Sequence, residues 1–220
     1  MEHKIEYGPS FSLLSIKLGQ GDKVTAESGA MVSMDGTVNI ETKMQGGLGA
    51  ALKRSFLGGE SFFMNHFTGQ GEVTFAANTP GDISHVKMTG NTLLVQSGSF
   101  ICSSGDVNVD TKFGGAKSFF SGEGLFLLKI SGTGDLFIGS YGAITMRELA
   151  AGQILKVDTG HMVAFDESVK YEVKAVGGLK STLLSGEGLV ASFTGPGRVW
   201  IQTRSLDAFI ALIEPKITKK

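Results

Sequence analysis

The amino-acid sequence predicts an all-β protein built from three imperfect repeats of about 65 residues. The motif Ser-Gly-Glu-Gly-Leu at residues 121–125 recurs at 185–189, with a degenerate copy at 58–62, and a Gly-x-Gly unit follows each copy. Glycine is abundant, at 32 of 220 residues, and proline is scarce, at 4, which indicates many tight turns. Between the glycines, apolar and polar residues alternate as they do in half-buried strands.

The first repeat, at approximately residues 1–80, reads as a series of short strands. A strand is expected over 11–18, where it ends in a Gly-rich turn. Asp35-Gly36 stands between two alternating segments, 31–34 and 37–41. This dipeptide predicts a two-residue hairpin turn that joins the two segments as neighbouring strands.

An insertion in the first repeat departs from strand periodicity. Four apolar residues within 48–56 have the spacing of a short amphipathic helix, with Lys53 and Arg54 among them. We expect this helix to pack on its own sheet. The alternative is that Lys53 and Arg54 contact a protein partner or a membrane surface.

The second and third repeats, at approximately residues 81–143 and 144–210, reuse segments of the first. Residues 27–32, for example, have counterparts at 96–101 and 158–163. No Ser-rich or Pro-rich linker separates the repeats. Residues 1–215 are therefore expected to form a single domain.

A helix is expected at the C-terminal end of the third repeat. Leu206, Phe209, Ile210 and Ile213 follow helical spacing, Ser205 is a suitable N-cap, and Pro215 is expected to close the helix. This helix is predicted to plug one end of the sheets. The tail at 216–220 is expected to fray.

Composition and charge exclude several classes of protein. The formal net charge of −1 supplies no general attraction to nucleic acid or anionic lipid. The one cysteine, Cys102, excludes an intrachain disulfide framework and lies in an apolar segment, so we expect it to be buried. The N-terminal residues have the features of neither a signal peptide nor a mitochondrial presequence, and no apolar run is long enough to span a bilayer. A cytoplasmic location is expected.

Three glutamates, Glu60, Glu123 and Glu187, recur at the same place in the three repeats. They could line a pseudo-threefold axis and bind a cation. We favour a simpler interpretation, in which each carboxylate accepts backbone N–H groups of its own glycine turn. A metal site also needs converging ligands, and no His or Cys stands at ligand spacing nearby.

The remaining motifs predict no catalytic chemistry. His161 lies in a patterned segment, but Ala30 and Ser99 occupy its equivalent positions, so we interpret it as structural. The Gly-x-Gly units lack the third glycine and the following helix of a dinucleotide site. No Gly-x-Ser-x-Gly nucleophile motif is present. The sequence therefore predicts no catalytic residue, no cofactor and no resident metal.

Five long motifs, taken in order, resemble one family. They are residues 46–54, 59–63, 140–142, 158–165 and 194–204. Together they resemble the "altered inheritance of mitochondria" family over nearly the whole chain. The resemblance implies an all-β fold of repeats like that of the Trp RNA-binding attenuation protein, related to double-stranded β-helices, and assembly into homo-oligomers. Fungal members are tied to mitochondrial inner-membrane organisation, and the family has no established catalytic residues.

The function expected from these observations is a non-catalytic, self-assembling scaffold or interaction protein. Its expected partners are further copies of itself, as a trimer or a multiple of three, and either a protein or a membrane surface. A small-ligand or RNA-binding module is one alternative, by analogy of fold alone. A metal-dependent enzyme of the cupin kind is the other. The near-neutral charge disfavours nucleic acid as a partner.

Overall fold

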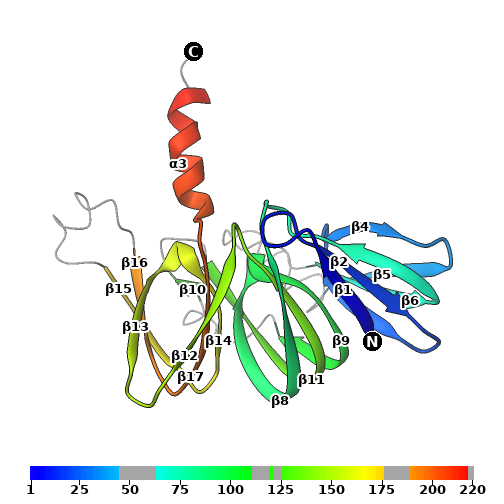
Figure 1. Ribbon diagram of the computed structural model, residues 1–220, viewed down its shortest axis with the longest axis horizontal. Coiled ribbons are helices and arrows are strands. Elements are labelled where there is room, and N and C mark those ends of the chain that lie inside the picture. The colour runs from blue at the N-terminus through cyan, green and yellow to red at the C-terminus, as the bar shows by residue number, and fades with distance from the viewer. Residues whose placement is uncertain (45–62, 111–118, 121–124, 176–188, 218–220) are drawn as a thin grey trace.

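The computed structural model describes residues 1–44, 63–110, 119–120, 125–175 and 189–217. Within these ranges the chain forms three bodies that lie side by side in a row, with one helix standing away from them (Figure 1). All strand pairs within the sheets are antiparallel, apart from one isolated parallel bridge outside them. The all-β prediction with a C-terminal helix is confirmed.

The strands form three sheets. The four-stranded sheet has the order β1 (Glu2–Glu6), β2 (Leu13–Leu18), β7 (Gly71–Phe75), β4 (Met31–Met34). The three-stranded sheet has the order β13 (Ile154–Asp158), β16 (Leu189–Thr194), β15 (Lys170–Ala175). These two sheets lie in the bodies at opposite ends of the row (Figure 1).

A ten-stranded sheet runs through all three bodies. Along it lie β12 (Ile144–Leu149), β17 (Gly197–Gln202), β14 (Met162–Asp166), β8 (Ile83–Gln96), β11 (Leu125–Gly139), β9 (Phe100–Asp110), β3 (Lys23–Glu27), β6 (Phe63–Gly69) and β5 (Val38–Met44). The tenth strand, β10 (Phe119–Phe120), pairs with β11. Two 3-10 turns, η1 (Ser97–Ser99) and η3 (Thr159–His161), precede β9 and β14.

Each body has its own hydrophobic core. In the first, the four-stranded sheet packs on the ten-stranded sheet, and the rings of Phe67 and Phe75 meet edge to face at 5.3 Å. The middle core is built on β8, β9 and β11. In the third, Phe165 and Phe193 pack between the three-stranded sheet and the other end of the large sheet. Cys102 is fully buried, as predicted, and its burial raises the pKa of its thiol well above the usual value.

The Gly-x-Gly units lie where one strand passes close to the backbone of another. Gly69 and Gly132 have φ of +122° and +121°, a region that glycine alone adopts easily. A Cβ at Gly69 would clash with the carbonyl oxygen of Thr37, and one at Gly132 with that of Asp106. Close backbone approach therefore accounts for glycine at these two positions.

The predicted hairpin at Asp35-Gly36 is wrong. A turn is present, since the Val38 N–H donates to the Asp35 carbonyl at 3.0 Å, but β4 pairs with β7 and β5 pairs with β6. Gly36 does not have the positive φ that a type I′ turn needs. Asp35 is instead tied to β7, because its carboxylate accepts the Glu72 N–H at 2.8 Å. The chain thus changes sheets at this turn.

The C-terminal helix, α3 (Leu206–Ile217), does not plug the sheets as predicted. It points away from them, and none of its residues is buried (Figure 1). Ser205 is the N-cap, with its hydroxyl accepting the Ala208 N–H at 3.4 Å. The helix runs two residues past Pro215, so Pro215 does not close it as predicted. The predicted helix within 48–56 and residues 218–220 of the tail lie outside the described residues.

Candidate functional site

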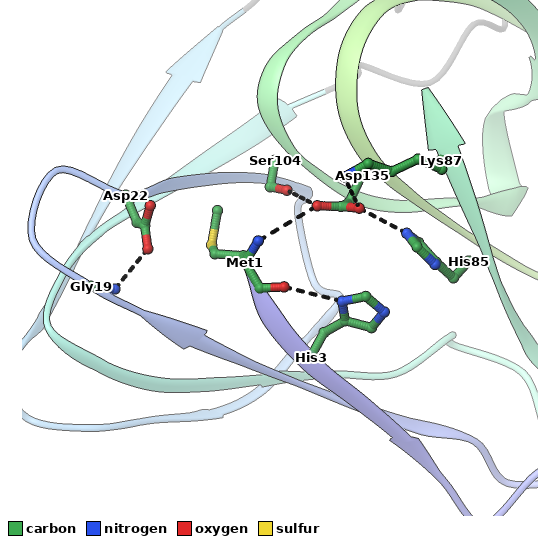
Figure 2. A network of polar contacts seen from close by, with 8 residues as sticks. All are labelled: Met1, His3, Gly19, Asp22, His85, Lys87, Ser104 and Asp135. Atoms are coloured by element: carbon green, nitrogen blue, oxygen red, sulfur yellow. Dashed lines mark hydrogen bonds and ion pairs between the residues drawn. The ribbon is translucent and has the colours of Figure 1, made fainter. Parts of the chain in front are cut away.

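The most concentrated polar cluster of the described residues surrounds Asp135, directly after the second Gly-x-Gly unit. Asp135 lies on β11, between β8 and β9, and only 5% of it is exposed. His85 Nε2 and Lys87 Nζ each donate to its Oδ1 at 2.9 Å, and the Ser104 hydroxyl donates to Oδ2 at 3.3 Å (Figure 2). The amino group of Met1 lies 3.8 Å from Oδ2. Side chains of β8 and β9 and the amino group that precedes β1 thus meet at one carboxylate of β11.

The charges around Asp135 keep it ionised. Burial alone would raise the pKa of this carboxyl group, but the hydrogen bonds and charges of Lys87 and His85 outweigh burial and lower the pKa to about 2. At neutral pH, Asp135 is therefore a buried anion with cationic partners. Such a group holds strands together.

Aromatic rings surround the same cluster. The His85 ring stacks on Phe137 with centroids 5.0 Å apart, and the His3 ring lies 4.4 Å from His85 and 5.0 Å from Phe137. His3 Nδ1 also donates to the Met1 carbonyl at 3.3 Å (Figure 2). These contacts fasten β1 onto the central strands. In the described part of the chain, no three His, Cys, Asp or Glu residues are placed to hold a metal ion.

The structure describes one of the six candidate residues predicted from the sequence. His161 lies in η3, and its Nδ1 donates to the Gln202 carbonyl at 2.8 Å. Gln202 Nε2 in turn donates to the carbonyl of Gly160 at 2.9 Å, so η3 is held against β17. The other five candidates lie outside the described residues: Glu60, Glu123, Glu187, Lys53 and Arg54.

Sequence reasoning missed the Asp135 cluster, because His85 and Asp135 are 50 positions apart and meet only through strand register. One signal could have found it. A charged residue follows each Gly-x-Gly unit, namely Glu72, Asp135 and Arg198. The side chains of Asp135 and Arg198 bond to Ser104 and Asp166, on the strand or turn that the glycines cross. Glu72 reaches Asp35 through its backbone N–H.

A second candidate surface is apolar and lies on the side of the body from which α3 projects (Figure 1). The Phe209 ring of α3 contacts Tyr141 at 6.0 Å, and the Tyr141–Gly142 turn bridges to Gly81. Gly81 in turn accepts the Ser12 N–H at 3.0 Å, next to Phe11, which is 71% exposed. We call this the helix-side surface; it comprises Tyr7, Phe11, Tyr141, Leu206, Phe209 and Ile210. Tyr7, Phe11, Leu206, Phe209 and Ile210 are each at least 43% exposed, and exposed apolar patches mark interaction sites.

Known proteins resemble this chain over nearly its whole length. The profile of a family described as "Mitochondrial biogenesis AIM24" matches residues 3–204. An uncharacterized protein of Streptococcus pyogenes serotype M6 is 30% identical over 224 residues, covering 97% of this chain and 90% of the relative. A crystal structure of a Streptococcus pyogenes protein superposes with a TM-score of 0.82 at 28% identity, over 98% of this chain and 99% of that one. Among the described residues, no helix is long and apolar enough to cross a membrane.

Proposed function

This chain belongs to the mitochondrial biogenesis AIM24 family, as its motifs predicted, and on that premise we propose that it is a non-catalytic scaffold that assembles from copies of itself. The observation that carries this proposal is the uncovered apolar stripe of α3. Leu206, Ile210 and Ile217 on this stripe are 43%, 47% and 72% exposed. Fully burying a side chain of this size contributes about 1.5–3 kcal/mol to stability. An isolated copy, in which these side chains stay partly exposed, does not gain all of it.

The spacing of the stripe favours another copy of the same helix as its partner. Leu206, Ile210, Ile213 and Ile217 are separated by four, three and four residues, the spacing with which helices interlock along a seam. A helix of 12 residues is marginal alone in water, so a matching helix would stabilise it. Tyr141, whose ring lies against that of Phe209, extends the apolar contact beyond the helix. We expect a trimer or a multiple of three.

The chemistry of the Asp135 cluster supports a structural role over a catalytic one. A general base works best with a pKa near the working pH, whereas the pKa of Asp135 is about 2. Both of its oxygens already accept hydrogen bonds from the protein. We infer that Asp135 stabilises the fold, and that the fold in turn positions the helix-side surface.

Light scattering coupled to size-exclusion chromatography tests the proposal. In high salt, which screens contacts between exposed charges, we expect the wild-type chain to be a discrete oligomer and the Ile210→Asp/Ile217→Asp double variant to be a monomer with unchanged circular dichroism. Ala211→Asp is the matched control, because it places a charge on the opposite side of the same helix and should leave the oligomer intact. A monomeric wild-type chain at every accessible concentration would overturn the proposal.

The cytoplasmic location and a further protein or membrane partner stay predictions. Fractionation of the host cells checks the location. Crosslinking in the cells, compared between wild type and the Ile210→Asp/Ile217→Asp variant, checks whether any partner requires the assembled state.

A further inference from the structure

We propose that copies of this chain also join end to end, through an acidic sheet face at one end of the row of bodies and a basic sheet face at the other. This inference rests on the proposed self-assembly and identifies a second contact for it. The two faces are the outer sides of the four-stranded and three-stranded sheets, which belong to the bodies at opposite ends of the row (Figure 1).

The acidic face lies on β1, β2 and β7 and surrounds a depression of about 420 Å³. Two of its carboxylates are paired with lysines: Lys17 Nζ lies 3.8 Å from a carboxylate oxygen of Glu2, and Lys4 Nζ lies 2.6 Å from one of Glu6. Asp35 and Glu72 line the same depression, and no ion pair reaches either of them within the described residues. Their shared hydrogen bond, from the Glu72 N–H to Asp35 Oδ2, holds the two residues together. The face thus presents two carboxylates in excess.

The basic face lies on β13, β16 and β15 around a depression of about 300 Å³. Strand register sets Lys156 beside Ser192 and Lys170 beside Thr194, so the two lysines flank the central strand. Glu172, which lines this depression, is paired with Lys174 at 2.9 Å, and Asp158 at the end of β13 accepts the Gly160 N–H at 2.9 Å. In the part of the chain that the structure describes, no ion pair engages Lys156 or Lys170.

The two faces are complementary in charge and number, with two unpaired carboxylates on one and two unpaired ammonium groups on the other. Ile154, which is 61% exposed at the rim of the basic depression, supplies an apolar contact beside them. Complementary charges of this kind speed encounter and set which surfaces meet, and exposed pairs weaken as salt rises. The occupant of each face is therefore a second copy of this chain.

A contact between two different faces of identical copies has a geometric consequence. Such a contact either closes into a ring or continues as an open filament, depending on the rotation between copies. A contact of α3 with α3 is symmetric and closes on itself. The two contacts together would build an extended assembly rather than a single closed oligomer.

Charge-reversal variants of the full chain test the end-to-end contact by sedimentation velocity, in the wild-type and Ile210→Asp/Ile217→Asp backgrounds. The basic-end variant is Lys156→Glu/Lys170→Glu. The acidic-end variant is Asp35→Asn/Glu72→Lys, because asparagine keeps the side-chain oxygen that accepts the Glu72 N–H. Lys23→Glu, an exposed residue on neither face, is the control. Each end variant alone should raise the concentration needed for half-assembly by about tenfold, and the control should not.

Mixing the two end variants in the Ile210→Asp/Ile217→Asp background gives the sharpest outcome. Each variant alone has two faces of like charge and should not assemble, whereas the mixture brings faces of opposite charge together and should assemble with equal numbers of the two variants, then fall apart at high salt. If neither end variant alters assembly and the mixture forms no pair, the end-to-end contact is wrong, while assembly through α3 would stand. A wild-type chain that stays monomeric at low and high salt would overturn both proposals.

Discussion

Arg198 holds Asp166 through two parallel hydrogen bonds of 2.9 Å, from Nε and Nη2 to the two carboxylate oxygens. The Asp166 carboxylate also accepts the Arg198 N–H at 2.8 Å, and the guanidinium lies 4.9 Å from the centre of the Trp200 ring. This fork joins the end of β14 to the start of β17. Together with the stacked Trp200, it gives the basic and aromatic residues of β17 a structural role.

Replacing Arg198 with lysine should destabilise the third body. A lysine keeps the charge but cannot form the two-pronged contact or stack in the same way, so we expect a loss of about 1–2 kcal/mol in the free energy of unfolding. Urea denaturation measures it. Arg204→Lys is the control, because Arg204 is exposed and its guanidinium donates to the Thr203 carbonyl at 3.1 Å, with no carboxylate paired to it among the described residues. Equal stability of the two variants would contradict the prediction.

Asp135→Asn should be among the most destabilising of the conservative substitutions. It removes the anion and leaves Lys87 and His85 next to a neutral amide. The Lys87 side chain is 62% exposed and stays hydrated, so we expect a loss of about 1.5–3 kcal/mol, the range for hydrogen bonds to a charged group. Asp106→Asn, an exposed position on the neighbouring β9, should change stability little. Chemical denaturation of both variants at pH 7 makes the comparison.

The Asp135 cluster should also make stability depend on acid pH. The pKa of Asp135 is lowered from about 3.9 in an unfolded chain to about 2 in the fold. Its contribution is therefore complete above about pH 5 and is lost as the pH falls towards 2. The stability difference between wild type and Asp135→Asn should shrink by about 2 kcal/mol across that range. A difference that stays constant from pH 5 to 2 would rule out this linkage.

Gly132→Ala should be far more damaging than alanine at a glycine in open space. Its φ of +121° and the clash with the Asp106 carbonyl oxygen add strain of about 1–3 kcal/mol or more. Gly98→Ala is the control, because nothing lies within 4 Å of its Cβ and its φ is not in the positive region. Thermal unfolding should show a lower midpoint for Gly132→Ala only.

Much of the fold could be predicted from local pattern. The alternation of apolar and polar residues predicted the strands, and Cys102 was rightly expected in the core. The crossing at Gly132 shows why glycine stands there. Which strands pair with each other was harder to predict. Asp35-Gly36 has the sequence of a hairpin, but the Asp35 carboxylate binds β7 and the chain changes sheets, which no local pattern encodes.

The candidate sites were less predictable for the same reason. Asp135, His85 and Lys87 meet because β8 and β11 pair over most of their length, so their contact depends on register rather than on spacing in the sequence. The apolar spacing of α3 predicted the helix correctly, but the prediction that this helix packs on its own sheets was wrong, since they do not cover it. Amphipathicity shows that a helix has a face to bury and leaves open which surface buries it.

The continuous ten-stranded sheet makes the three bodies mechanically inseparable. β8 pairs with β11 in the middle of the molecule and with β14 of the third body, while β9 pairs with β3 of the first. Cutting the chain between bodies would expose unpaired strand edges, which promote aggregation. We therefore expect calorimetry to show one cooperative melting transition for the whole chain, unlike the stepwise melting of arrays whose units touch only at their borders.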